Sequence, residues 1–289
     1  MLWLGDPRHL PGGTAFECVE APGDALALCN AALPVLPVPF AQPTTAGQLT
    51  PENASGVIQS IETAVALAQA GAVSAVCTAP LNKAALQDGA GFAYPGHTEF
   101  LAALDGGADV VMMLASEQLR VVPATIHIPL ADVPRALTPA LLEQVIRTTH
   151  AGLIRDFNIP APRIAVSGLN PHAGESGKMG LEDAAMITPL LDRLRADGFD
   201  LRGPLPADTM FHAAARAQYD AAIAMYHDQA LIPIKTLDFD RGVNVTLGLS
   251  FVRTSPDHGT ALDIAGQGIA NPTSLIEALK MAHSMGARR

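Results

Sequence analysis

The chain has 289 residues, of which 49% are hydrophobic and 16% charged, and its formal net charge is −10. This length predicts about two domains or one large α/β unit with a sizeable core. The acidic balance argues against a nucleic-acid-binding surface, which needs a basic footprint. Three cysteines without a CxxC pattern argue against a disulfide scaffold and a thiolate zinc site. With no secretion signal and no apolar run of ~18 residues, we expect a cytoplasmic protein that spans no membrane.

Strand-like and helix-like segments alternate along the chain. The first are a short strand with a turn at 1–7, an extended proline-rich segment at 35–51, and a helix at 52–71 that ends in glycine. Further strands are expected at 72–80, 109–116, 119–130, 163–170, 221–229 and within 242–255, and further helices at 138–158, 185–198, 259–268 and 271–286. This alternation favours an α/β fold with a parallel or mixed sheet covered by helices on both faces.

Polar clusters end or follow several of the predicted strands, and three of them contain a histidine: His127, His172 and His227. The carboxyl ends of strands are where ligands bind in open α/β sheets. Three imidazoles that converge at one sheet edge suit Zn²⁺ or a similar divalent ion and leave a position open for substrate. No local spacing such as HxxxH supports this. The alternative is three unrelated histidines that form hydrogen bonds at the starts of loops.

Two further clusters suit an anion. His97 and Thr98 follow a Pro-Gly turn and precede a helix, whose N-terminus favours negative charge, although a simple helix cap explains them equally well. Lys235, Asn244 and Arg253 lie in the most polar stretch of an apolar chain and are able to hydrogen-bond a phosphate. The alternative for these three is a solvated loop with stray charges.

Lys83 and Asp228 are candidates for proton transfer, because each carries a titratable group in a polar cluster that ends or follows a predicted strand. Each also has a structural alternative, namely a lysine that caps a loop and a carboxylate that pairs with Lys235. The glycine-rich turn at 168–180 is suited to bring backbone N–H groups near a phosphate, but it is neither GxGxxG nor a Walker loop.

Several long motifs, taken together and in this order, resemble the 4-hydroxythreonine-4-phosphate dehydrogenase family of pyridoxal phosphate biosynthesis. They are PGHTEF (95–100), LRVVPATIHIPL (119–130), GLNPHAGESGKMG (168–180), GPLPADTMF (203–211), AMYHDQALIPIKTLDFDRGVNVTLGL (224–249) and RTSPDHGTALDIAGQG (253–268). The resemblance runs from about residue 44 to the C-terminus. It implies the two-domain fold of the isocitrate and isopropylmalate dehydrogenases, with mixed sheets, a central cleft and a homodimer. In residues 1–289 we expect two interleaved lobes, with chain crossings near 120–130 and 240–260.

The resemblance also implies an activity. It is the oxidation of 4-phosphohydroxy-L-threonine by NAD or NADP to 2-amino-3-oxo-4-phosphooxybutanoate, which loses CO₂ to give 3-amino-2-oxopropyl phosphate. A divalent metal (Zn, Mg or Co) would be held by His127, His172 and His227, with ligands shared between the two subunits. Substrate contacts would come from His97, Thr98, Lys235, Asn244 and Arg253, and Asp228 would accept the proton.

One departure from the family pattern is expected at the N-terminus. Family members begin with a strand, a glycine-rich turn and a helix, whereas this chain opens on MLWLGDPRHL, which resembles the family's second strand. Three rival functions stay open at this level. They are the same fold acting on a phosphothreonate or related hydroxy acid or on a cyclic diol, a metal-dependent hydrolase, and a non-catalytic ligand-binding remnant.

Overall fold

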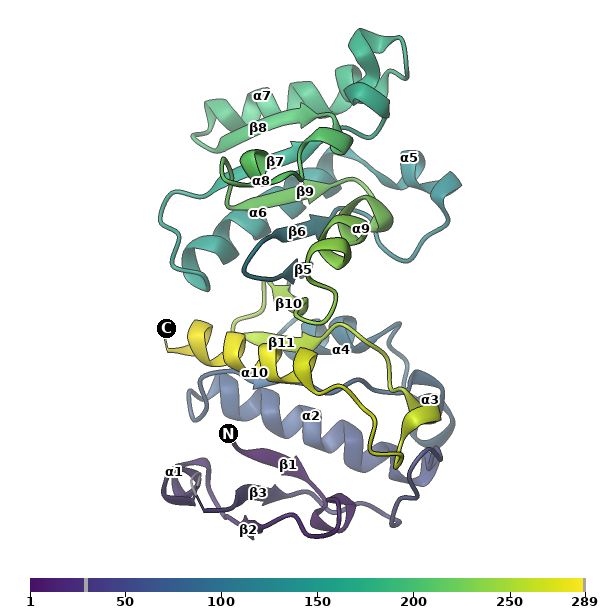
Figure 1. The fold of residues 1–289 in the computed structure, drawn as a ribbon, viewed down its shortest axis with the longest axis vertical. Helices are drawn as coiled ribbons and strands as arrows, with labels where there is room; N and C mark the ends of the chain where they lie inside the picture. The colour runs from purple at the N-terminus through teal and green to yellow at the C-terminus, as the bar shows by residue number, and fades with distance from the viewer. Residues whose placement is uncertain (29–30, 288–289) are drawn as a thin grey trace.

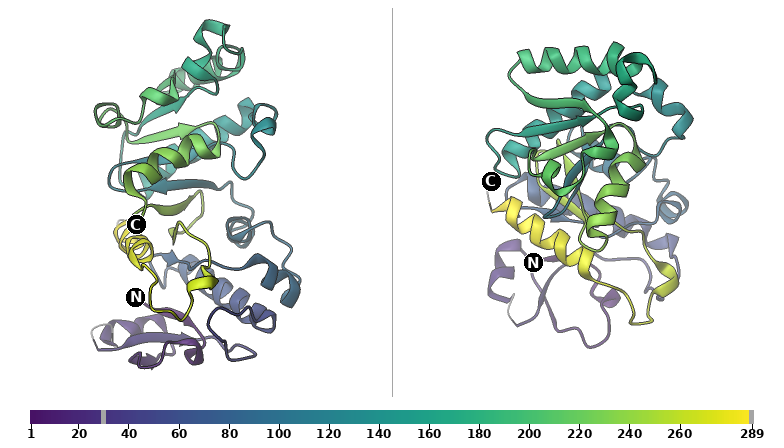
Figure 2. Two further views of the ribbon diagram at one scale, coloured as in Figure 1. Left: turned by 45° about the vertical axis from the view of Figure 1, so that its right-hand side comes forward. Right: turned by 45° about the horizontal axis from the view of Figure 1, so that its top comes forward.

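The computed structural model describes residues 1–28 and 31–287. Within this part of the chain the strands form a three-stranded sheet at one end of the molecule and an eight-stranded sheet along the rest (Figures 1 and 2). The helices are α1 (Ala25–Leu28), α2 (Ala54–Gln69), α3 (Lys83–Ala90), α4 (His97–Leu104), α5 (Val133–Ala136), α6 (Pro139–Arg155), α7 (Thr188–Ala196), α8 (Ala213–Arg216), α9 (His227–Asp238) and α10 (Thr273–Gly286). Among the described residues, none of these helices combines the length and the apolar character needed to cross a bilayer.

The small sheet has the order β1-β3-β2, and its neighbouring strands are parallel. Its strands are β1 (Trp3–Gly5), β2 (Phe16–Cys18) and β3 (Leu33–Pro37). Helix α2 lies between this sheet and α10 (Figure 1). Apolar side chains of α2, such as Ile61 and Val65, pack with Phe100 of α4 and with Leu249 and Phe251 in one buried cluster.

The large sheet has the order β4-β11-β10-β5-β6-β9-β7-β8. Its strands are β4 (Val76–Cys77), β5 (Val111–Ala115), β6 (Arg120–Pro123), β7 (Arg163–Ser167), β8 (Asp200–Leu205), β9 (Ala221–Ala224), β10 (Val243–Leu247) and β11 (Arg253–Pro256). From β6 to β8 all neighbours are parallel, whereas β10 is antiparallel to both β5 and β11, and β5 is antiparallel to β6. The sheet is therefore mixed.

Alternate side chains along a strand of the large sheet pack into two different hydrophobic cores. On β9, Ile223 packs in a cluster with apolar residues of α6 and α7, whereas Ala222 and Ala224 pack in another cluster with Ala230 and Ile234 of α9. Successive side chains of a strand point to opposite faces of a sheet. Helices therefore cover both faces here, and the expected α/β class with mixed sheets and covering helices is confirmed.

Some predicted element boundaries are wrong. The strand expected at 119–130 ends at Pro123, and the backbone reaches a left-handed conformation at His127 (φ 52°). The strand expected at 221–229 ends at Ala224, and the helix expected at 259–268 is only a 3₁₀ turn, Leu262–Ile264. Strands β2 and β8 and helices α3 and α9 had no predicted counterpart.

Candidate functional site

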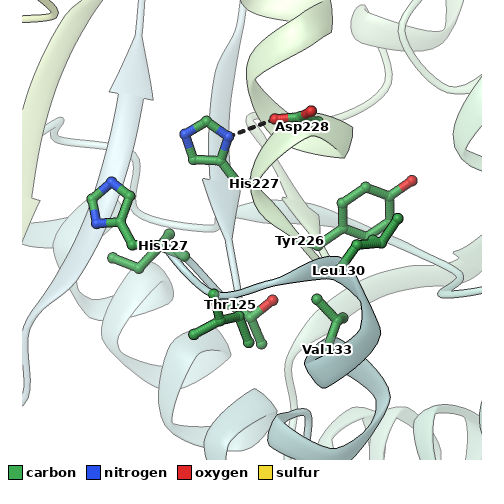
Figure 3. Close-up of a pocket in the computed structure, with 9 residues that line it drawn as sticks. Thr125, His127, Leu130, Val133, Tyr226, His227 and Asp228 are labelled. Atoms are coloured by element: carbon green, nitrogen blue, oxygen red, sulfur yellow. Dashed lines mark hydrogen bonds and ion pairs between the residues drawn. The ribbon is translucent and has the colours of Figure 1, made fainter.

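The parallel strands β6, β9 and β7 end at the same edge of the large sheet, and each is followed by a segment with one of the three histidines. His127 lies in the segment after β6, and His227 is the first residue of α9. Their ring centroids are 5.9 Å apart. Both rings line a pocket of ≈ 310 Å³ (Figure 3). The other lining residues are Thr125, Ile126, Ile128, Leu130, Val133, Tyr226 and Asp228.

His227 is oriented by its neighbour. Its Nδ1 lies 2.7 Å from Oδ1 of Asp228, whose side chain is 70% exposed (Figure 3). Because an ionised carboxylate only accepts hydrogen bonds, Nδ1 is the nitrogen that carries the hydrogen. The Nε2 lone pair of His227 is then available to a metal ion. A histidine whose other ring nitrogen donates to a carboxylate is the usual form of a metal-ligating histidine.

His172 occupies a different setting from the other two histidines. It lies in the turn Pro171–Gly177 after β7, where five consecutive residues, 172–176, have positive φ. Among the described residues no group of three or more His, Cys, Asp or Glu side chains is placed to hold a metal ion. The fold therefore brings His127 and His227 close together in one chain, and His172 does not complete a three-ligand group with them there.

Arg253 forms a second centre, away from solvent. Its side chain on β11 is only 4% exposed and donates to Thr78 Oγ1 (2.8 Å, from Nη2) and Thr246 Oγ1 (2.9 Å, from Nη1). No ion pair to Arg253 is found within residues 1–28 and 31–287. Burial lowers the pKa of the guanidinium to about 10, so it still carries its charge at neutral pH. A buried cation without a counter-ion is costly, and an anionic ligand would relieve this cost.

Two polar atoms near this centre have no hydrogen-bond partner in the described part of the chain: Nε2 of His97 and Oδ1 of Asn244. Burial, and secondly the charge of Arg253, lower the pKa of His97 to about 3, so its imidazole is neutral at pH 7. Asn244 lies on β10 and pairs with Ser255 of β11. Ser255 is two positions along β11 from Arg253. Buried polar groups normally have partners, so these atoms indicate a site for a polar ligand.

The remaining predicted residues are less buried. Thr98 is half-buried in the first turn of α4, directly after His97. Lys235 in α9 forms an ion pair with Asp257 (Nζ to Oδ2, 2.8 Å), so the alternative pairing with Asp228 is wrong. Lys83 is exposed at the first residue of α3.

Some residues of the site were missed in the sequence. Thr78 and Thr246 hold Arg253, and both lie on or directly after strands that are neighbours of β11. Gln229 connects three elements: its Oε1 accepts from Ser167 Oγ (2.8 Å) and from Met225 N (2.7 Å), and its Nε2 donates to Gly168 O (2.9 Å). The only available signal for Gln229 was its place directly after His227 and Asp228.

Comparison with known proteins identifies the family of this chain. The family model described as "Pyridoxal phosphate biosynthetic protein PdxA" matches residues 12–282. A protein of Ruegeria sp. (strain TM1040) named 4-hydroxythreonine-4-phosphate dehydrogenase is 65% identical over 100% of this chain and 88% of its own length. A protein of the same name from Paracoccus denitrificans is 63% identical over 100% of this chain and 90% of its own length.

Solved structures agree with these relatives. The crystal structure of 4-hydroxythreonine-4-phosphate dehydrogenase from Klebsiella pneumoniae has a TM-score of 0.89 and 37% identity, covering 99% of this chain and 90% of that one. A terephthalate 1,2-cis-dihydrodiol dehydrogenase from Burkholderia xenovorans has a TM-score of 0.69 and 25% identity, covering 98% of this chain and 97% of that one. The resemblance carried by the sequence motifs is thus confirmed, and the chain belongs to the family of the pyridoxal phosphate biosynthetic protein PdxA.

Proposed function

We propose that this protein oxidises the secondary alcohol of 4-phosphohydroxy-L-threonine, with NAD or NADP as hydride acceptor, in pyridoxal 5′-phosphate biosynthesis. The product, 2-amino-3-oxo-4-phosphooxybutanoate, is a 3-keto acid and loses CO₂ to give 3-amino-2-oxopropyl phosphate. Relatives that are more than 60% identical over the whole chain carry the name of this activity. The proposal includes two interleaved lobes that cross near 120–130 and 240–260, a homodimer and a cytoplasmic location.

The observation that carries the proposal is the buried Arg253 without a counter-ion. A phosphate supplies the missing negative charge and accepts two parallel hydrogen bonds from a guanidinium. Neutral His97 and the amide of Asn244 both present unpartnered polar atoms, and we assign them, with Thr98, to the phosphorylated substrate. Lys235 would join them from α9, where Asp257 now holds its ammonium group.

The residues at the pocket fit a divalent metal. His127 and His227 lie close together, and the hydrogen bond from His227 to Asp228 leaves Nε2 of His227 free to bind. We assign His172 as the third ligand, in a site shared between two subunits. A bound Zn²⁺, Mg²⁺ or Co²⁺ would lower the pKa of the substrate alcohol and stabilise the developing oxyanion.

Asp228 is the proposed proton acceptor. Its carboxylate is exposed at the pocket and touches His227, so it can take a proton from the substrate hydroxyl and release it to solvent. Lys83 is the second candidate for this role. A bound NAD or NADP would supply the hydride acceptor, because no protein side chain is able to take up a hydride.

The proposed function is tested by NADH formation with the purified protein, a divalent metal and 4-phosphohydroxy-L-threonine, in parallel with phosphothreonate. We expect turnover with the amino acid. Turnover with phosphothreonate alone would assign the protein to a sister activity on an acid substrate. If the protein binds the metal but forms no NADH with either substrate, the proposed dehydrogenase activity is contradicted. This result would favour a hydrolase or a non-catalytic binding protein.

A further inference from the structure

The turn that carries His172 has an unusual backbone. Residues 172–176 have φ values of 51°, 51°, 76°, 41° and 58°, and only one of the five is glycine. L-residues in a left-handed conformation place Cβ close to the following carbonyl oxygen, so each non-glycine residue here is strained. Such strain persists only where the surrounding structure enforces it, and it concentrates at functional sites. Contacts outside the turn must therefore hold it.

The side chain of Asp183 makes such contacts. It is 1% exposed and lies in a π-helical turn, Asp183–Ile187, that leads into α7. Its Oδ1 accepts from Leu169 N (2.8 Å), and its Oδ2 accepts from Asn170 N (3.1 Å) and Asn170 Nδ2 (2.9 Å). One carboxylate thus fixes two consecutive backbone N–H groups just before the turn. Hydrogen bonds to a charged acceptor are the stronger kind.

The turn also folds back against this carboxylate. A Cβ added to Gly168 would lie 2.7 Å from both Ala173 Cα and Asp183 Oδ1, and one added to Gly174 would lie 3.3 Å from Asp183 Oδ2. Asp183 therefore touches the chain before the turn and again in its middle. His172 lies in the sequence between these two contacts. The contacts of Asp183 therefore fix the position of the His172 backbone relative to the end of β7.

Glu182 offers a comparison within the same segment. Its Oε2 accepts from Asn170 Nδ2 (2.8 Å), like the carboxylate of Asp183. Glu182 is more exposed than Asp183 and accepts no hydrogen bond from the backbone of Leu169 or Asn170. It shares one contact with Asp183 and lacks the two that hold the backbone.

We propose that Asp183 is the positioning residue of His172. By holding the left-handed turn in place, it places His172 where it can bind the metal. The proposal rests on the proposed function only in taking His172 as a metal ligand. Asp183 is buried, and the proposal assigns it no direct contact with metal or substrate. Residues that orient a metal ligand typically contribute about 10–100-fold to metal affinity.

The test uses Asp183→Asn, which keeps the side-chain volume but replaces one acceptor oxygen with a donor amide facing N–H groups. In the metal-free protein we expect backbone amides of residues 169–179 to exchange with deuterium at least about tenfold faster than in the wild type. We expect the Kd for Zn²⁺, measured by calorimetry, to rise about 10–100-fold. Glu182→Gln is the matched control and should change neither quantity.

Two more variants make the result decisive. Asn170→Ala serves if Asp183→Asn does not fold. It removes the side-chain contacts of Asn170 to Asp183 and to Glu182. It should produce changes of both quantities that are smaller than those expected for Asp183→Asn but larger than those in Glu182→Gln. His172→Ala measures what the ligand itself contributes to the Kd. Unchanged hydrogen exchange and an unchanged Kd for Zn²⁺ in Asp183→Asn overturn the proposal. If Asp183→Asn does not fold, unchanged values of both quantities in Asn170→Ala overturn it. An unchanged Kd in Asp183→Asn beside a large loss in His172→Ala also overturns it and leaves the proposed function standing. An unchanged Kd in both Asp183→Asn and His172→Ala contradicts the metal assignment on which both depend.

Discussion

At the scale of single residues, Arg253 should affect binding and stability in opposite directions. We predict that Arg253→Met raises the KM for a phosphorylated substrate about 10–100-fold, because hydrogen bonds to charged groups contribute about 1.5–3 kcal/mol. We expect the unliganded variant to be at least as stable as the wild type, since the buried cation has hydroxyl groups and no carboxylate as partners among the described residues to offset its desolvation. Steady-state kinetics and urea unfolding measure the two effects.

Arg241→Met is the control for this change, because Arg241 is exposed and lies after α9. It should leave both KM and stability near the wild-type values. Unchanged KM and kcat in Arg253→Met would remove Arg253 from the substrate site.

His97 should make the protein sensitive to acid. Burial lowers its pKa in the folded protein to about 3, against 6.5 for the unperturbed group. At pH values between these two pKa values, His97 is protonated in the unfolded chain and neutral in the folded protein. The contribution of His97 to stability is therefore complete above about pH 6.5 and declines as the pH falls, by at most ~1.4 kcal/mol per pH unit.

This dependence is measured by urea unfolding at pH 7 and pH 5. The loss of stability between these two pH values should be smaller in His97→Gln than in the wild type. His212→Gln, at an exposed histidine, is the control and should show the wild-type loss. An identical pH dependence in His97→Gln and the wild type would mean that His97 is not kept neutral by its surroundings.

At the scale of elements, Gln229 joins the ends of β7 and β9 to the first turn of α9. We predict that Gln229→Leu lowers the free energy of unfolding by about 1–3 kcal/mol, because the buried Met225 N and Ser167 Oγ lose their acceptor. Urea unfolding measures the change. Gln218→Leu, which removes only an exposed contact to Arg202, should cost much less. Equal effects of the two substitutions would contradict this role of Gln229.

The sequence predicts those elements best whose own pattern is strong. Helices α2, α6 and α10 have regular apolar spacing or clear caps, such as Thr138, whose side chain accepts from Leu141 N. Helix α9 was missed because Pro233 lies inside it and charged residues follow. Its apolar contacts to the sheet come from Ala230, Leu231 and Ile234, a short set that the surrounding polar residues obscured.

The candidate site also has features that the sequence predicts and features that it does not. The positions of His127, His172 and His227 after parallel strands follow from the alternation of elements, which sequence shows. The partners of Arg253 follow from strand pairing between residues far apart, such as Thr78, and sequence shows no such pairing. The left-handed turn at 172–176 also escapes prediction, because Ala173, Glu175 and Ser176 belong to residue types that rarely adopt this conformation.

At the scale of the whole molecule, the proposed metal site requires a second subunit. Of the three proposed ligands, the described part of one chain brings His127 and His227 together without His172. The apolar side chains of Ile128 (39% exposed) and Leu130 (68% exposed) are exposed to solvent beside them. An interface that covers these side chains would place a partner at the pocket. We predict a homodimer in sedimentation experiments, and we predict that Leu130→Glu weakens it and reduces turnover.

Leu26→Glu is the control for the interface, because Leu26 is also a highly exposed leucine but belongs to α1 at the small sheet. It should leave the dimer intact. A fully active monomer, in the wild type or in Leu130→Glu, would contradict the shared site.

The pairing of β4 with β11 constrains how the chain folds as it is synthesised. Residues 76–77 pair with residues 253–254, and the apolar cluster around α2 is completed only by Leu249 and Phe251. At about 5–20 residues per second, the ribosome needs on the order of ten seconds or more to make the intervening chain. During this time the pairings among β5, β6, β7, β8 and β9 can form without the C-terminal strands, while α2 can pack only against the earlier members of its cluster, such as Leu86 and Phe100. The cluster around α2 therefore reaches its final packing only after residues 249–254 have been synthesised.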